Sequence, residues 1–257
     1  MSFTAAQLVD WLHAFFWPFL RVAAMITAAP VLGSESISPR ARLMVAIMIT
    51  LLLVPVLPPP QTPALFSAAW GLAVVQQIFI GLVIGFTLQL AFEAIIVGGQ
   101  IVAMGAGLGF AQLTDPVRGV TTPVVSQYFI ILASLLFLAL QGHLLLIRYT
   151  ADSFQWLPIG PAGLEWGAAW AVAGFASNMF AGAIQVALPA TLAVLLVNIA
   201  FGVISRSAPA LNLFSIGLPA ALLFGLAVLP LTLDGFAGGF NQLLEQAWQL
   251  IGNILRG

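Results

Sequence analysis

Residues 64–104 read ALFSAAWGLAVVQQIFIGLVIGFTLQLAFEAIIVGGQIVAM, and Glu93 is their only charged side chain. A helix that crosses a bilayer needs about 20 mainly apolar residues, each adding about 1.5 Å to its length. The tract is too long for one perpendicular crossing, so we expect it to tilt, break or project beyond the bilayer. It predicts a helical membrane protein.

The composition of the whole chain points to the same class. The 257 residues are 61% hydrophobic and 6% charged, with a mean hydropathy of +1.11, whereas a soluble domain carries roughly 25% charged residues. The chain has no cysteine, which excludes disulfides, thiolate catalysis and Cys-ligated metal. All seven basic residues are arginine, so no P-loop lysine is available for ATP. The net charge of -1 gives no reason to expect nucleic acid.

Six apolar tracts organise the chain and predict an all-α membrane fold of about six hydrophobic helical tracts, several of them broken or overlong. They cover residues 6–32, 42–57, 64–104, 123–147, 168–204 and 209–231. Pro189 lies inside the overlong fifth tract and Pro219 inside the sixth. Because proline removes a helical hydrogen bond, we expect a break or kink at each, within a C-terminal helical hairpin whose two arms bend together.

The tail after residue 238 has a helical pattern of apolar and polar positions. The apolar positions are Phe240, Leu243, Leu244, Ala247, Trp248, Ile251 and Leu255, and opposite them lie Asn241, Gln242, Glu245, Gln249 and Asn253. This pattern predicts an amphipathic helix. Its polar face lacks the lysines and arginines of a helix that lies on lipid, so docking on protein is at least as well supported.

The arginines suggest a topology. If the tracts alternate across the membrane, one side carries Arg40, Arg42, Arg118 and Arg206, and the other carries Arg148 and Arg256. Cytoplasmic loops are enriched in basic residues. We therefore expect the loop of the C-terminal hairpin, which begins at Arg206, in the cytoplasm and both termini outside it.

Small and polar residues form a stripe along the third tract. Its members are Gln77, Gly81, Gly85, Gln89, Glu93 and Gln100, mostly four residues apart. One interpretation is helix packing in lipid, where small residues allow close approach and amides bond across helices. The other is an aqueous conduit, which Glu93 favours because an ionisable group at membrane depth usually faces protein or water. Both stay open.

The remaining ionisable side chains in the tracts suggest no catalysis. We expect Arg21 to extend toward the membrane surface or to pair across a subunit contact, and His143 to lie at the interface. A proton relay through His13 or His143 would need acidic partners that these tracts do not provide. The chain has no H-E-x-x-H and no G-x-S-x-G motif, so we expect no enzyme, no cofactor and no metal site.

Residues 105–124, GAGLGFAQLTDPVRGVTTPV, interrupt two apolar tracts. Asp115 before Pro116, with Gly119 after Arg118, would suit an ordinary turn. The alternating glycines before Phe110 instead suit a re-entrant segment, because non-helical backbone at membrane depth survives only beside protein or water. The residues alone favour neither interpretation.

Three regions resemble the FliR/SctT family of type III secretion export-gate subunits, and the N-terminal region looks more flagellar than virulence-type. The pattern R-x-A-P-x-L-N-x-F-S-x-G-x-P is met by Arg206, Ala208, Pro209, Leu211, Asn212, Phe214, Ser215, Gly217 and Pro219. The second region matches through Gly109, Phe110, Asp115, Pro116, Gly119 and Pro123. The N-terminal region matches through Pro18, Arg21, Pro30, Gly33, Pro39 and Arg42.

The resemblance implies a non-enzymatic, pore-forming subunit of the flagellar type III export gate, which passes unfolded export substrates across the bacterial inner membrane at the basal body. It implies FliP-like and FliQ-like gate subunits and FlhB-like and FlhA-like export components as partners. Residues 1–164 would be a FliP-like part that includes the glycine-rich loop 105–122. Residues 165–257 would be a FliQ-like hairpin and tail, in one integrated membrane domain.

Under this resemblance, the loop would plug the closed pore. The plug residues would be Gly107, Gly109, Phe110, Leu113, Asp115, Pro116, Arg118 and Gly119. Arg206, Pro209 and Asn212 would contact a partner at the cytoplasmic hairpin loop. Two alternatives from other classes are a self-contained secondary transporter of a small solute, which would show paired inverted repeats, and a lipid-embedded scaffold without a pore.

Overall fold

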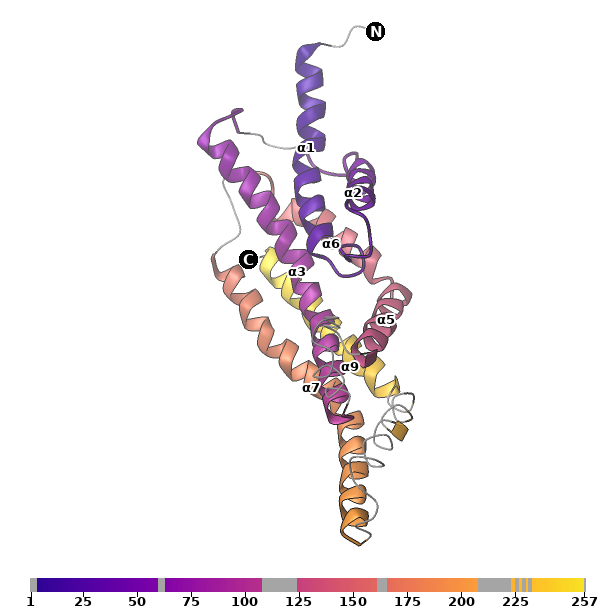
Figure 1. Ribbon diagram of the computed structural model, residues 1–257. Helices are drawn as coiled ribbons and strands as arrows, with labels where there is room; N and C mark the ends of the chain where they lie inside the picture. The colour runs from indigo at the N-terminus through magenta and orange to yellow at the C-terminus, as the bar shows by residue number, and fades with distance from the viewer. Residues whose placement is uncertain are drawn as a thin grey trace. The chain divides into compact units, whose positions relative to one another are not determined.

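The computed structural model describes residues 4–59, 63–107, 124–160, 166–207, 223–224, 227, 230 and 233–256. The regular elements within these ranges are helices (Figure 1), which confirms the all-α class. They are α1 (Ala5–Ala28), α2 (Pro39–Leu53), α3 (Ala68–Gly105), α5 (Val124–Ala139), α6 (Gly142–Trp156), α7 (Trp166–Ser207) and α9 (Leu233–Arg256). Most of the expected sixth tract, including Pro219, lies outside the described residues.

Within the described ranges, three helices are long and apolar enough to cross a membrane. They contain the segments Trp11–Ala28, Ala68–Gly105 and Gly167–Ile204. The pair α5 and α6 adds a fourth crossing if it is counted as one span, although its two helices are bent by 63°. The chain is therefore a helical membrane protein, and the described residues contain three or four of its candidate crossings.

The bend corrects the expectation that residues 123–147 form one tract. The first helix ends at Ala139, and Gln141 adopts a left-handed conformation with φ 56° immediately before α6. Gly142 lies so close to the ring of Phe137 that an added Cβ would overlap it. A residue without a side chain is therefore needed where the second helix begins, and Gln-Gly is the local sequence that permits the bend.

The two overlong tracts form continuous helices. The 38 residues of α3 are uninterrupted, and the 42 residues of α7 continue through Pro189. The helix is therefore not interrupted at Pro189. Figure 1 shows that α7 changes direction along its length, and the kink assigned to Pro189 stays a prediction. At about 1.5 Å per residue, each helix is roughly twice as long as the apolar core of a bilayer is thick.

The helix starts follow from local sequence. Thr4 and Gln7 form a reciprocal capping box at the start of α1, and Ser38 caps α2 ahead of Pro39. Both arrangements provide acceptors for backbone N–H groups that a first helical turn leaves without partners. The short helix α2 packs beside α1 (Figure 1).

The chain divides into two compact units. One contains Met1–Leu90, Phe137–Phe175 and Gln246–Gly257, and the other contains Ala91–Leu136 and Ala176–Glu245. The helices α3, α5, α7 and α9 therefore contribute residues to both. The expected division into residues 1–164 and 165–257 was based on resemblance along the sequence, not on contacts within the fold. It stays a prediction.

Each unit has an aromatic core. In the first unit, Trp17 is fully buried and its ring centroid lies 6.0 Å from that of Trp70. In the second unit, the Phe92 and Phe240 centroids are 5.2 Å apart in an edge-to-face arrangement. These contacts join helices that are distant in the sequence, and such ring pairs add about 0.5–1.5 kcal/mol to the burial itself.

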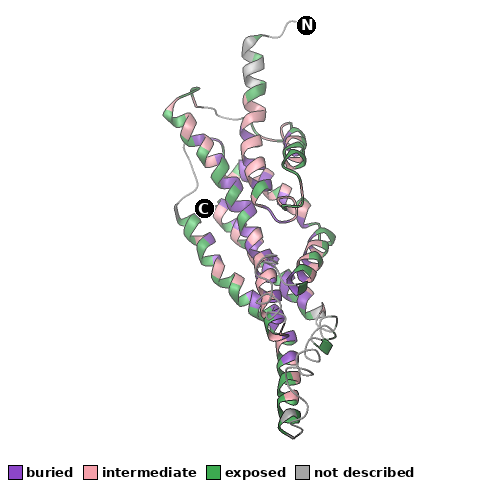
Figure 2. Cartoon of the chain, in the orientation of Figure 1, coloured by how far each residue is buried: buried purple, intermediate pink, exposed green. Residues whose placement is uncertain are grey.

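The amphipathic tail helix is confirmed as α9 (Figure 2). The expected apolar face is buried, apart from a half-buried Trp248, and all five expected polar positions are exposed. Trp248 stacks on Tyr149 of α6 with centroids 5.3 Å apart. The apolar face of α9 is thus covered by the protein's own helices, as the absence of a basic polar face suggested.

Candidate functional site

The first half of the α3 stripe packs against α1. A Cβ added at Gly81 would lie 2.9 Å from Ala24 Cβ, and one added at Gly85 would lie 2.9 Å from Ala29 N. Real Cβ atoms do not approach other atoms so closely, so the two glycines allow the helix backbones to touch. Between residues 77 and 85 the stripe therefore serves helix packing within the chain, one of the two interpretations that the sequence left open.

Arg21 is fully buried where α1, α3 and α6 meet. Its Nε donates a hydrogen bond to Gln77 Oε1 at 2.8 Å, Nη1 donates to Ser153 Oγ at 2.8 Å, and Nη2 donates to Leu157 O at 2.9 Å. The guanidinium carbon also lies 3.9 Å from the centroid of the Phe154 ring. The expectation that Arg21 extends to the membrane surface or pairs with another subunit is wrong.

No carboxylate is among these partners of Arg21, so its charge is balanced in another way. Leu157 is the C-cap residue of α6, and the carbonyls at a helix C-terminus carry a partial negative charge that favours a nearby cation. Phe154 adds a cation–π contact from the same helix end. The buried guanidinium therefore caps α6 and connects it to α1 and α3.

The second half of the stripe is less buried. Gln89, Glu93 and Gln100 are all half-buried. Between Glu93 and Gln100, two glycines make close helix contacts in the second unit: a Cβ at Gly98 would lie 3.0 Å from Ala183 O, and one at Gly99 would lie 2.6 Å from the Cα of Ser126. A conduit or subunit-contact role for the stripe stays a prediction.

The glycine-rich segment begins at a defined helix end. The helix α3 ends at Gly105, whose carbonyl accepts a hydrogen bond from Asn198 Nδ2 at 3.3 Å. Gly107 follows with φ 79°, and its N–H donates to Met104 O at 3.1 Å. Left-handed glycines of this kind commonly stop helices. The other predicted plug residues, Gly109, Phe110, Leu113, Asp115, Pro116, Arg118 and Gly119, lie outside the described residues.

The hairpin residues are only partly described. Arg206 is exposed in the last turn of α7, while Pro209 and Asn212 lie outside the described residues. Pro189 is exposed on α7. The two histidines, His13 and His143, are half-buried. Among the residues that the structure describes, no three His, Cys, Asp or Glu side chains are grouped in a way that could hold a metal ion.

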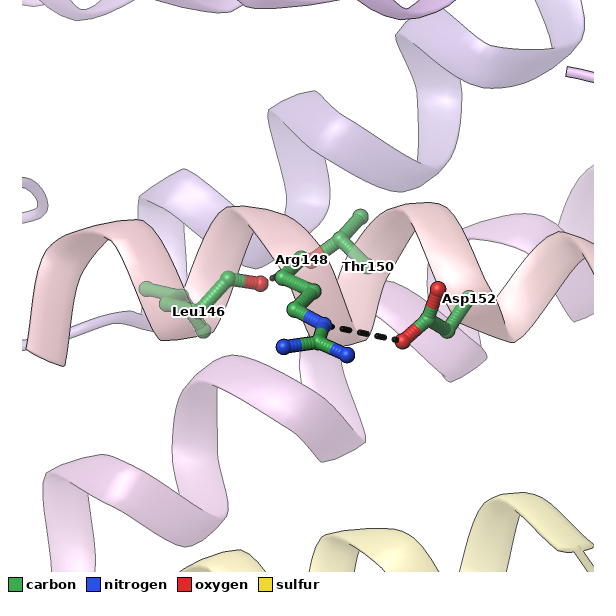
Figure 3. A network of polar contacts seen from close by, with 4 residues as sticks. All are labelled: Leu146, Arg148, Thr150 and Asp152. Carbon is green, nitrogen blue, oxygen red and sulfur yellow. Dashed lines mark hydrogen bonds and ion pairs between the residues drawn. The ribbon is translucent and has the colours of Figure 1, made fainter. Parts of the chain in front are cut away.

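A surface ion pair contrasts with the buried arginine. Figure 3 shows Arg148 and Asp152 on α6, one helical turn apart, with Arg148 Nε 3.7 Å from Asp152 Oδ2. The Arg148 side chain is 77% exposed. Thr150 Oγ1 on the same helix donates to Leu146 O at 2.8 Å. Pairs as exposed as Arg148–Asp152 contribute about 0–1 kcal/mol.

Sequence reasoning missed the partners of two polar side chains. Ser153 and Leu157 hold Arg21 from more than 130 residues away, and Asn198 reaches Gly105 across 93 residues. A signal existed for each, because Arg21 and Asn198 are isolated polar residues in apolar helices. Burial of a charged group such as Arg21 requires hydrogen-bond partners, whereas Asn198 is exposed. The sequence did not say which partner.

The long apolar helices, their glycine contacts and a buried, internally bonded arginine define an integral membrane protein of the all-helical class. A family model described as bacterial export proteins, family 1, matches residues 12–247. The chain therefore belongs to this family of bacterial export proteins.

Full-length relatives narrow the branch of the family. Flagellar biosynthetic protein FliR of Escherichia coli (strain K12) is 37% identical over 256 residues, covering 99% of this chain and 97% of the relative. FliR of Pectobacterium carotovorum subsp. carotovorum is 37% identical over 255 residues, with the same coverage. FliR of Buchnera aphidicola subsp. Acyrthosiphon pisum (strain APS) is 33% identical over 229 residues, covering 89% and 88%. The resemblance to the FliR/SctT family, and its flagellar character, are confirmed.

Proposed function

We propose that this chain is a pore-forming subunit of the flagellar type III export gate, which passes unfolded export substrates across the bacterial inner membrane. The observation that carries the proposal is the match to flagellar export relatives over almost the whole chain. The apolar helices support a multi-pass position in the membrane. The energy for transport would come from the proton motive force and a separate ATPase, because this chain has no P-loop lysine.

The plug of the closed pore would be the glycine-rich segment from Gly107 to Gly119. The left-handed Gly107 supports this, because it ends the helical backbone directly after a candidate membrane span. Phe110 would be the apolar seal, and Asp115 and Arg118 would anchor the closed arrangement. Glycines would let the segment pack closely and then move.

The exposed side of α7 supports assembly with other membrane proteins. Only 17% of the most apolar stretch of α7 is buried, against 67% of the corresponding stretch of α3. The exposed large apolar side chains of α7 are Trp170, Phe180, Ile184, Leu188, Leu192, Leu195, Leu196, Ile199, Val203 and Ile204. FliP-like and FliQ-like gate subunits would cover part of this surface. FlhB-like and FlhA-like components would bind on the cytoplasmic side, where Arg206, Pro209 and Asn212 would make contact.

Purification from membranes in mild detergent tests the assembly. We expect the tagged chain to bring FliP-like and FliQ-like chains with it. A secondary transporter, which the flagellar relatives do not favour, would instead come out alone or as a homo-oligomer, and that result would contradict the proposal.

Ion leakage across the inner membrane tests the plug. Deleting part of residues 107–113 should raise the leakage in cells that carry the complete export apparatus. Unchanged leakage together with normal motility would remove the plug from the proposal.

A further inference from the structure

Three aromatic side chains and an arginine join the C-terminal ends of α6 and α9. Tyr149 stacks on Trp248 with ring centroids 5.3 Å apart and an interplanar angle of 12°, and it meets Trp156 edge-to-face at 6.3 Å. The guanidinium carbon of Arg256 lies 4.8 Å from the centroid of the Trp156 ring. All four residues belong to the first compact unit. We call them the α6–α9 aromatic cluster.

The cluster lies at the surface of its unit rather than in the core. Its three aromatic residues are half-buried and Arg256 is exposed, whereas Trp17 in the core of the same unit is fully buried. Each aromatic side chain therefore packs on protein with one part and leaves another part open. Half-buried Trp and Tyr side chains are typical of the boundary between membrane and water, where one end of the ring is in apolar surroundings and the other is hydrated.

The exposed surface along α6 changes from apolar to polar at the same place. Just before the cluster, Leu138, Leu140 and Leu144 are 40%, 47% and 52% exposed. One helical turn after Leu144, the Arg148 side chain is 77% exposed, and Gln155 further along is exposed as well. Since α5 and α6 together form a candidate membrane crossing, this change marks the level at which lipid chains give way to headgroups.

Two arginines lie at this level. Arg148 forms the long surface pair with Asp152 (Figure 3), and no carboxylate pairs with Arg256 among the residues that the structure describes. Arg256 contacts Trp156 through the face of its guanidinium, which leaves the N–H donors in the guanidinium plane available. Two arginines and one aspartate leave a net positive charge. The sequence also led us to expect both arginines on one side of the membrane.

We propose that the α6–α9 aromatic cluster, with Arg148, is a membrane-interface anchor that binds the phosphate of an anionic lipid headgroup. The aromatic side chains lie at headgroup level, and the two guanidinium groups donate hydrogen bonds to phosphate oxygens, which their planar geometry suits. The anchor goes beyond the proposed function and does not depend on the pore. Each arginine beside an anionic bilayer contributes about 5-fold to binding, so the two together contribute about 25-fold.

Lipid titration of the complex purified in mild detergent tests the binding. Phosphatidylglycerol, phosphatidylcholine and inorganic phosphate are added separately while Tm is followed, because a ligand that binds the folded state raises Tm. The variant carries Arg148→Gln and Arg256→Gln together, which removes both charges from exposed positions. Arg40→Gln is the matched control, because Arg40 is an exposed arginine at the start of α2, outside the cluster.

We expect phosphatidylglycerol to raise the wild-type Tm at a lower concentration than phosphatidylcholine, and inorganic phosphate to have no effect. The double variant should need about 25-fold more phosphatidylglycerol for the same rise, and Arg40→Gln should respond as the wild type does. The proposal is overturned if the two lipids act alike, if inorganic phosphate replaces the lipid, or if the double variant and the Arg40→Gln control respond equally.

Fluorescence quenching in nanodiscs tests the depth of the cluster independently of charge. The chain has no cysteine, so Gln155→Cys or Leu144→Cys provides a single labelling site when the other chains of the complex also lack cysteine. We expect a lipid with a nitroxide at the headgroup to quench a label at 155 more than a mid-chain nitroxide does, and the reverse order at 144. The same order at both positions would show that no boundary lies between them and would overturn the anchor.

Discussion

Replacement of Arg21 by methionine should destabilise the protein strongly. Methionine is long and apolar, so it fills much of the space, but it removes the charge and the donors to Gln77, Ser153 and Leu157. Ser153 keeps a partner, because its Oγ donates to Thr150 O at 2.6 Å. The Gln77 side chain does not, since its Nε2 already lacks a partner in the part of the chain that the structure describes.

Two opposing effects set the magnitude for Arg21→Met. Three hydrogen bonds from a charged donor contribute about 1.5–3 kcal/mol each, or roughly 5–9 kcal/mol together. Several kcal/mol are recovered, because the variant no longer buries a cation without a carboxylate. The loss of the hydrogen bonds outweighs this gain, because the folded protein is already arranged around them. We expect a net loss of about 3 kcal/mol in the free energy of unfolding.

Thermal unfolding of the complex purified in mild detergent measures this loss. For a chain of this size, about 1 kcal/mol lowers Tm by roughly 2–4 °C, so Arg21→Met should lower it by about 6–12 °C. Arg148→Met is the matched control, because the 77% exposed Arg148 side chain makes a surface pair with Asp152, and its Tm should change by about 4 °C or less.

A double variant tests the reasoning itself. Gln77→Leu removes the amide that Arg21→Met would leave without a partner, so the two changes together should cost about 1–2 kcal/mol less than their sum. Strict additivity, or an Arg21→Met protein as stable as the Arg148→Met control, would refute the role assigned to this network.

Two further predictions concern local backbone. Gly81→Ala should force α1 and α3 apart and reduce the yield of assembled complex, because the added Cβ would meet the backbone of α1. Gly71→Ala is the control, since nothing lies within 4 Å of an added Cβ there. It should leave the yield unchanged or higher. Gln141→Gly should raise Tm by about 2–4 °C, because glycine adopts φ 56° without the penalty of about 1 kcal/mol that glutamine carries; a lower Tm would contradict it.

Much of the helical organisation was predictable, because it depends on neighbours in sequence. The pattern of apolar residues from Phe240 to Leu255 predicted the buried face of α9. The lengths of the apolar tracts predicted the long helices α3 and α7. The bend at Gln141 was not predicted, because most of residues 123–147 are apolar and the turn depends on the left-handed Gln141 and on the contact between Gly142 and the Phe137 ring. The helix α7 continues through Pro189, because one missing hydrogen bond is too little to interrupt so long a helix, and the kink expected there stays a prediction.

The sequence by itself determined the class of this protein and its family. Hydropathy and helical periodicity are local properties, and the motif around Arg206 is a pattern of residue types at fixed spacing along the chain. Only the tertiary structure decided what the isolated polar residues do. Arg21 meets Gln77 across 56 residues and Ser153 across 132, and Asn198 meets Gly105 across 93. Such pairs form where glycines let helix backbones approach, and which faces meet there is decided by packing in three dimensions, which no local pattern records.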